Sequence, residues 1–212
     1  KSVAVFFLSK STFVKADLNI LSSHYQVHER AFFNKWNGNT SIIFQWLRQL
    51  FWIIRNRKSI DILYCWFVDY HALMPAWASK VFNIPLVCVL GGFDTVNIPK
   101  WKHGLFESSW RAPIGRYVYK NADLLLPVSK SLIESENSFT YQVRSKFGVK
   151  QELKNVELSR IESLPTGYDV GFWETDRSER DNVITTVAFI NGKISGVQIP
   201  NCWSSRSFLT KN

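Results

Sequence analysis

Short apolar runs alternate along the chain with longer segments of helical periodicity. The apolar runs cover residues 3–8, 60–67, 85–90 and 122–128, and such runs are typical of strands buried on both faces of a parallel sheet. Residues 25–33 alternate in polarity and predict another strand, and residues 159–164 predict a short late one. Helices are predicted over residues 13–23, 42–54, 72–82, 114–120 and 139–147, and another after Ser129. The alternation predicts an α/β fold, a Rossmann-like parallel sheet flanked by helices.

The same pattern divides the chain into three parts. Residues 1–165 hold the strand–helix units and are expected to form one Rossmann-like domain. A turn that starts with Pro165-Thr166-Gly167 and a charged run at residues 176–181 together predict a linker over residues 166–182. Residues 183–190 again look like a strand, so residues 183–212 are expected to be the incomplete start of a second domain or a disordered tail.

Charge is concentrated in the first part of the chain. Residues 1–60 hold nine lysines and arginines against two acidic residues, which accounts for +7 of the net charge of +9. This imbalance indicates an anionic partner: a membrane surface, a nucleic acid or a phosphorylated ligand. Nucleic acid is disfavoured because no recognition motif accompanies the basic residues. No run approaches the roughly 18 apolar residues of a membrane-spanning helix.

The three cysteines carry no pairing pattern. Their number is odd, no CxxC spacing occurs, and Cys65 and Cys88 lie within predicted strands. Buried free thiols and a reducing compartment are therefore expected, without a disulfide scaffold or a zinc site.

Candidate binding residues follow the predicted strands. Gly91 and Gly92 end the run at residues 85–90 and precede Phe93 and Asp94, where a tight turn allows close approach of a ligand. A purely structural turn is the alternative. His71 follows the preceding strand, and a structural histidine is the alternative there too. Neither GxGxxG nor a P-loop occurs, which disfavours dinucleotide binding after the first strand.

Two further segments allow two interpretations each. The helix at residues 42–54 has a wide apolar face, which either covers the sheet, with cations at the helix C-terminus, or lies on an anionic bilayer. In the second case the membrane contacts are two tryptophans at the headgroup level and four cations: Trp46, Trp52, Arg48, Arg55, Arg57 and Lys58. The need to cover a sheet favours the first. Ser129 stands at a helix N-cap, where free amides bind anions, although capping alone also explains it.

Four motifs in order then carry a resemblance to a known family. They are Phe-Val-Lys-Ala-Asp-Leu-Asn-Ile-Leu at residues 13–21, Gly-Gly-Phe-Asp at 91–94, Asn-Ala-Asp at 121–123 entering a strand that ends Pro-Val-Ser, and Leu-Pro-Thr-Gly-Tyr-Asp at 164–169. Together they resemble the N-terminal half of a GT-B glycosyltransferase of family 4, over about residues 3–190.

The resemblance implies two Rossmann-like lobes, the N-terminal lobe binding a saccharide or lipid-linked acceptor and the C-terminal lobe a nucleotide-sugar. It implies a retaining transfer without metal or other cofactor, often in polysaccharide synthesis by a cytoplasmic enzyme peripheral to the inner face of the membrane. On this reading Asp94 and His71 orient the acceptor hydroxyl. The acceptor is expected to contact six residues: Ser9, Lys10, Gly91, Gly92, Phe93 and Ser129.

The chain departs from the family in two places. Many members carry a histidine where this sequence has Gly91 and Gly92. The donor site implied by the family needs an Arg/Lys pair and two glutamates eight residues apart, yet no glutamate follows Glu179. The expectation is a truncated acceptor-side half, inactive alone; a non-catalytic Rossmann-like module that binds an anionic ligand or a membrane surface is the alternative.

Overall fold

Six parallel strands form the central sheet of the protein. The computed structural model describes residues 1–32, 41–99, 102–136 and 146–167. The strand order is β2-β1-β3-β4-β5-β8, and every neighbouring pair is parallel. The strands are β1 (Ser2–Phe7), β2 (Gln26–Ala31), β3 (Ile62–Trp66), β4 (Leu86–Leu90), β5 (Leu124–Pro127) and β8 (Arg160–Ile161). The predicted fold class, a Rossmann-like α/β sheet, is confirmed.

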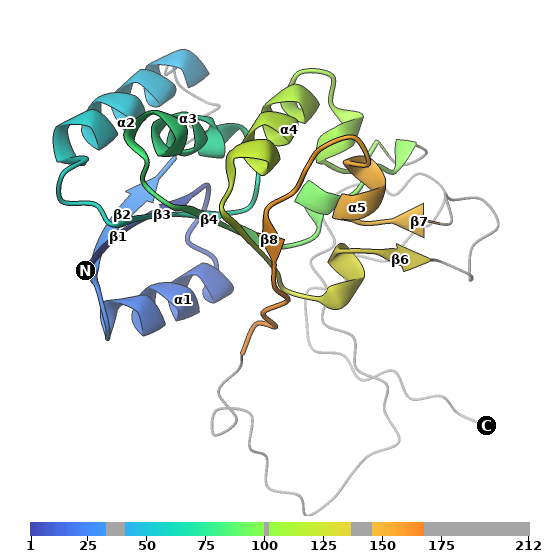
Figure 1. Ribbon diagram of the computed structural model, residues 1–212, viewed down its shortest axis with the longest axis horizontal. Helices are drawn as coiled ribbons and strands as arrows, with labels where there is room; N and C mark the ends of the chain where they lie inside the picture. The colour runs from blue at the N-terminus through green and yellow to red at the C-terminus, as the bar shows by residue number, and fades with distance from the viewer. Residues whose placement is uncertain (33–40, 100–101, 137–145, 168–212) are drawn as a thin grey trace, which may run out of the picture. The chain divides into compact units, whose positions relative to one another are not determined.

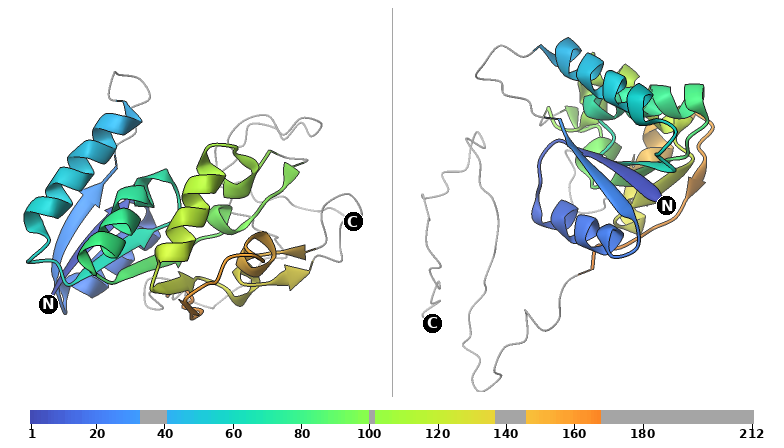
Figure 2. Two further views of the ribbon diagram at one scale, coloured as in Figure 1. Left: turned by 45° about the horizontal axis from the view of Figure 1, so that its top comes forward. Right: turned by 90° about the vertical axis from the view of Figure 1, so that its left-hand side faces the viewer.

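Helices cover both faces of this sheet (Figure 1). They are α1 (Thr12–Ser22), α2 (Ile42–Asn56), α3 (Leu73–Phe82) and α4 (Arg111–Asn121), with the short α5 (Val149–Glu152) near the end of the described chain. Helix α1 lies on one face, and α2, α3 and α4 lie side by side on the other (Figure 2). Opposite placement of the helices before and after β2 is what a doubly wound sheet requires.

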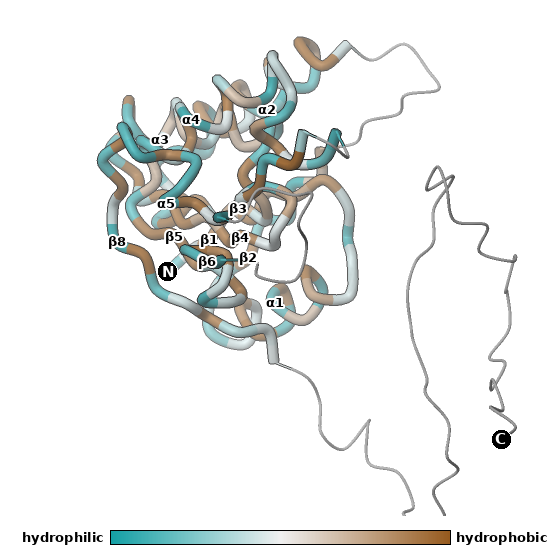
Figure 3. Tube along the Cα trace, turned by 90° about the vertical axis from the view of Figure 1, so that its right-hand side faces the viewer, coloured by the Kyte–Doolittle hydropathy of each residue, from teal (hydrophilic) through white to brown (hydrophobic). Residues whose placement is uncertain are grey.

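The core has two halves because the strands alternate between the two faces. Toward α1, β1 contributes Val3, Val5 and Phe7, which pack with Val14 and Leu18. Toward the other helices, its alternate residues join a larger cluster that includes Ala4, Phe6, Ile53, Leu63, Cys65, Leu86, Cys88 and Leu125. Figure 3 shows the apolar strands between α1 and α3. All six residues of β1 are buried, as the unbroken apolar run predicts.

The loops after the parallel strands all open at the same edge of the sheet, here called the carboxyl edge. The chain runs outward from β1 to β2 and then, across β1, to β3 on its other side, so the order reverses between β1 and β3. Ligands of open α/β sheets bind in the crevice at such a reversal, beyond the carboxyl ends of the strands. The architecture therefore directs attention to the loops that follow β1, β3 and β4.

Differences from the predicted elements are confined to the region after β5. Ser129 caps a single 3-10 turn at Lys130–Leu132 rather than a longer helix, and the chain continues into β6 (Ser135–Glu136). Strand β6 pairs antiparallel with β7 (Lys146–Phe147), so the predicted helix at residues 139–147 is wrong for its last two residues. Its remaining residues, 139–145, lie outside the described residues.

Lys1–Gly167 forms one compact unit. The predicted linker at residues 166–182, apart from its first two residues, and the predicted strand and tail at residues 183–212 lie outside the described residues. Cys65 and Cys88 are buried free thiols, as predicted. They lie opposite each other on β3 and β4. Among the described residues, no helix is both long and apolar enough to cross a membrane.

Candidate functional site

Asp94 fastens the loops after β3 and β4 at the carboxyl edge. Its side chain is fully buried and accepts hydrogen bonds from three backbone amides: Val68 N–H at 3.1 Å, Gly91 N–H at 3.1 Å and Gly92 N–H at 2.9 Å. Burial raises the pKa of Asp94 to about 6, against the opposing effect of these amide donors. The Asp94 carboxyl group therefore fixes the shape of the glycine turn by accepting hydrogen bonds from its backbone amides.

The two positions of this turn require glycine for different structural reasons. A Cβ on Gly91 would overlap the ring of Phe67, which follows β3 with a φ of 68°. A Cβ on Gly92 would only touch Leu132 Cδ2, at 3.9 Å, but Gly92 has a φ of 128°, which side-chain-bearing residues rarely adopt. Gly91 is exposed and Gly92 half-buried. The exposed Gly91 therefore brings backbone to the carboxyl edge, with the Phe67 ring packed against it.

His71 lies in the interior. It is fully buried, and its Nε2 lies 2.9 Å from the Trp66 carbonyl oxygen, while its Nδ1 has no hydrogen-bond partner. Burial lowers the pKa of His71 to about 4, so the ring is neutral at physiological pH and Nε2–H donates to that carbonyl. The burial of His71 and Asp94 favours positioning of the loops over direct contact with an acceptor, and their roles toward an acceptor stay predictions.

An ion pair that the sequence patterns did not indicate joins these loops to α4. The Arg111 guanidinium donates to both carboxylate oxygens of Asp69, with Nε 2.9 Å from Oδ1. The guanidinium also lies 4.8 Å from the Phe93 ring centroid and 5.6 Å from that of Tyr70. Asp69 is buried, and about a quarter of the Arg111 side chain is exposed. For Asp69 the sequence offered one signal, its position as an acidic residue shortly after a strand. For Arg111, which follows 42 residues later, it offered none.

The remaining predicted acceptor contacts also lie at this edge. Ser9 and Lys10 follow β1 and are exposed, and Lys10 Nζ is 2.6 Å from Glu29 Oε2. Phe93 is half-buried beside the glycines. Ser129 follows β5, is exposed, and caps the 3-10 turn by accepting from the Ser131 amide at 3.3 Å. The parallel sheet thus brings all six predicted contacts to one edge, without showing that they bind an acceptor.

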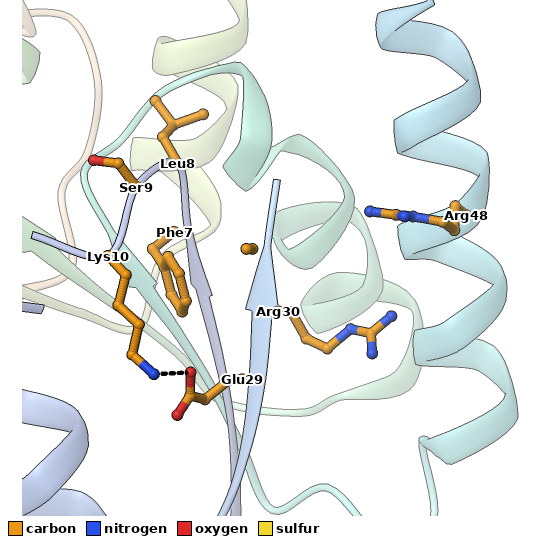
Figure 4. Close-up of a pocket in the computed structure, with 8 residues that line it drawn as sticks. Phe7, Leu8, Ser9, Lys10, Glu29, Arg30 and Arg48 are labelled. Atoms are coloured by element: carbon orange, nitrogen blue, oxygen red, sulfur yellow. Dashed lines mark hydrogen bonds and ion pairs between the residues drawn. The ribbon is translucent and has the colours of Figure 1, made fainter. Parts of the chain in front are cut away.

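A pocket of about 530 Å³ opens at the ends of β1 and β2 (Figure 4). Its polar lining consists of Ser9, Lys10, Glu29, Arg30 and Arg48. The Arg30 guanidinium stacks over the Trp52 ring at 4.3 Å. Arg48, which was also predicted as a membrane contact, lines this pocket, and Arg30 was not predicted at all. No group of three or more metal-ligating side chains occurs in the part of the chain that the structure describes.

Helix α2 lies against the sheet (Figure 2), as the first of its two interpretations predicts, but much of its apolar surface faces outward. Trp46 donates its Nε1–H to the Tyr70 carbonyl at 2.8 Å, and Trp52 packs edge-on against Phe6, so both tryptophans face the protein rather than a headgroup layer. The helix buries Gln45 and Gln49, whose Oε1 atoms have no hydrogen-bond partner among the described residues. Its outer face exposes four large apolar side chains by 56–67%, and a fifth by 37%: Ile43, Phe44, Leu47, Phe51 and Ile54. Arg55, Arg57 and Lys58 are exposed at its C-terminal end.

The comparisons with known proteins find similarity only to solved structures. No protein-family model and no curated protein sequence matches the chain. MurG of Acinetobacter baumannii is a solved structure with 11% identity and a TM-score of 0.45, covering 85% of this chain and 47% of its own. MnaA of S. aureus, solved with UDP, has 13% identity and a TM-score of 0.49, covering 86% and 50%. The chain thus spans about half the length of each, and these likenesses assign it no chemistry.

Proposed function

We propose that this chain is the acceptor-side lobe of a GT-B glycosyltransferase resembling family 4. In the whole enzyme, a sugar passes from a nucleotide-sugar to a saccharide or lipid-linked acceptor held at the carboxyl edge. The observation that carries this proposal is the glycine turn at residues 91–92, which Asp94 holds through hydrogen bonds to both glycine amides and in which Gly91 is exposed at the carboxyl edge. This turn lies beyond the strand ends of a doubly wound sheet, where ligands of such folds bind.

The chemistry of this edge suits a sugar. The Arg111 guanidinium lies over one face of the half-buried Phe93 ring, 4.8 Å from its centroid, and the uncovered part of the ring is the apolar surface proposed for the CH face of a pyranose. Because Gly91 and Gly92 carry no side chains, a hydroxylated ring can approach the turn closely. Asp94 and His71 act from the interior as positioning residues, because their burial keeps them from the solvent side of the loops.

The 212-residue chain is proposed to be inactive alone. Departure of the nucleoside diphosphate from the donor needs cationic groups that neutralise its developing charge. The family supplies them from a second lobe together with two glutamates, and the sequence after Glu179 contains no glutamate.

The experiment is an amide NMR titration of the chain with short alkyl glucosides and maltosides, below their micelle concentrations, and separately with UDP. The glycosides are expected to shift the amides of Gly91, Gly92 and Phe93, and UDP is not. Phe93→Ala should weaken glycoside binding by about tenfold, because the apolar platform is lost. Phe44→Ala, an equal truncation on the outer face of α2, should leave it unchanged. Shifts from UDP alone, or sugar transfer by this chain, would contradict the proposal.

We also propose that the outer face of α2 lies on an anionic membrane. Five exposed apolar side chains on one helix, with exposed Arg55, Arg57 and Lys58 at its end, form the pattern of an interfacial helix. The surface contacts are then the aliphatic and phenylalanine side chains of the outer face, in place of Trp46 and Trp52. Burying Gln45 and Gln49 instead of those side chains costs free energy in water, which a membrane would offset.

Vesicle sedimentation tests this surface. The chain should bind phosphatidylglycerol-containing vesicles more tightly than phosphatidylcholine vesicles, and added salt should weaken the binding. The double substitution Leu47→Glu with Phe51→Glu should reduce binding by at least about tenfold. Ile20→Glu is the matched control, since Ile20 is equally exposed on α1. Equal loss in the control, or binding that ignores lipid charge, would refute this surface.

A further inference from the structure

Two guanidinium groups converge in the pocket at the ends of β1 and β2. Arg30 extends from β2 toward α2, and Arg48 extends from α2 toward β2, into the same space (Figure 4). They come from separate elements, so their approach is a product of the fold. Pockets with converging cationic side chains are suited to anionic ligands.

Arg30 is held in place before any ligand arrives. Its guanidinium lies 4.3 Å from the centroid of the Trp52 ring, and the ring of His28, on the same side of β2, contacts Trp52 edge-on at 5.8 Å. Trp52 follows Arg48 by four residues, so the two lie on one face of α2. A stacked, half-buried arginine loses less conformational entropy when it binds an anion.

Neither arginine is neutralised by a carboxylate among the described residues. Glu29, the one acidic residue lining the pocket, points to the other face of β2, where it pairs with Lys10 at 2.6 Å. Burial lowers the pKa of Arg30, and the Arg48 guanidinium lowers it further. An anion between the two guanidiniums would remove this repulsion.

We propose that Arg30 and Arg48 bind a phosphoryl group of the acceptor in this pocket. This inference rests on the proposed acceptor role and adds to it that the acceptor is a phosphate- or diphosphate-bearing molecule. A carboxylate can be satisfied by one bidentate arginine, whereas two arginines from different elements match the larger number of oxygens and the higher charge of a phosphoryl group. The pocket volume of about 530 Å³ accommodates a diphosphate.

The test is calorimetric titration of the 212-residue chain with inorganic pyrophosphate at low ionic strength, followed by side-chain NMR of the arginine Nε–H groups. Arg30→Gln and Arg48→Gln should each weaken pyrophosphate binding by about tenfold. Arg55→Gln is the matched control: it removes one cation from the same helix outside the pocket and should change binding by less than about twofold. Thermal unfolding of each variant checks that the fold is kept.

Equal weakening by Arg55→Gln, or no pyrophosphate binding, would overturn the proposal. Vesicles distinguish the two sources of a phosphoryl group: if Arg30→Gln also abolishes binding to phosphatidylglycerol vesicles, the ligand is a lipid headgroup and the acceptor assignment is refuted. Retained vesicle binding supports the acceptor assignment. Failure of the alkyl glycosides to bind would refute the proposed function and leave the pyrophosphate result standing, so the two failures can be told apart.

Discussion

Asp94 offers a direct test of the carboxyl edge, because its burial favours the neutral carboxyl group while its amide donors favour the carboxylate. Burial raises its pKa from 3.8 to about 6, while three amide donors favour the carboxylate. The folded state therefore binds more protons than the unfolded state between these pH values. Its contribution to the free energy of unfolding is greatest at low pH and falls as pH rises toward 6, by about 1.4 kcal/mol per pH unit.

Asp94→Asn removes this dependence. Protonated Asp94 keeps all three amides paired, whereas the asparagine amide group turns an N–H₂ toward one of them and leaves it unsatisfied. At about pH 4.5 the variant should be less stable than the wild type by about 1–3 kcal/mol. By about pH 7.5 the wild type has lost about 2 kcal/mol of that advantage, so the gap should nearly close. Asp94→Ala, which leaves all three amides unpaired, should stay markedly less stable at both pH values.

Urea unfolding followed by tryptophan fluorescence measures these differences at both pH values. Comparing variants with the wild type cancels the titration of groups that they share. If the gap between the wild type and Asp94→Asn does not shrink between these two pH values, the pKa of Asp94 in the folded state lies at or below 3.8, and the reasoning from burial is refuted.

Three further predictions concern the interior and α2. Burial lowers the pKa of His71 from 6.5 to about 4, so the wild type should lose about 3 kcal/mol of stability as pH falls through this range, and urea titrations of His71→Gln should lack that loss. Gly91→Ala should destabilise by about 2–4 kcal/mol because the methyl group overlaps the Phe67 ring, and Phe67→Leu in the same chain should restore part of it; unchanged urea midpoints would contradict the close approach. Gln49→Leu should raise the free energy of unfolding by about 1–2 kcal/mol, since it replaces a buried unpaired amide oxygen, and a loss of stability would contradict the described orientation of α2.

The sequence predicted the sheet well because burial on both faces leaves a direct signature. The runs around β1, β3, β4 and β5 contain hardly any polar residues, since a central parallel strand contacts helices or neighbouring strands on every side. The glycine turn was also recognisable, because its position after β4 and its backbone requirements follow from local geometry. These features depend on neighbours in the chain, which a sequence displays.

Contacts between side chains that are far apart in the sequence were not predictable in the same way. Asp69 and Arg111 are 42 residues apart, and Arg30 meets Arg48 only because α2 crosses back over β2. The sequence left the orientation of α2 open for a related reason: its apolar face is wide enough to face either the sheet or the outside, and the choice depends on contacts of Trp46 and Trp52 with distant residues. No periodicity within residues 42–54 contains that information.

The orientation of α2 joins the two proposed surfaces in one element. Its outer face exposes Phe44, Leu47 and Phe51, while Arg48, between them in sequence, lines the pocket with Arg30. A helix repeats every 3.6 residues, so the pocket and the outer face are separated by little more than the diameter of one helix, about 10 Å. A phosphoryl group held in this pocket therefore lies within reach of a bilayer that contacts the outer face. This proximity favours an acceptor that stays anchored in the membrane while its sugar reaches the glycine turn.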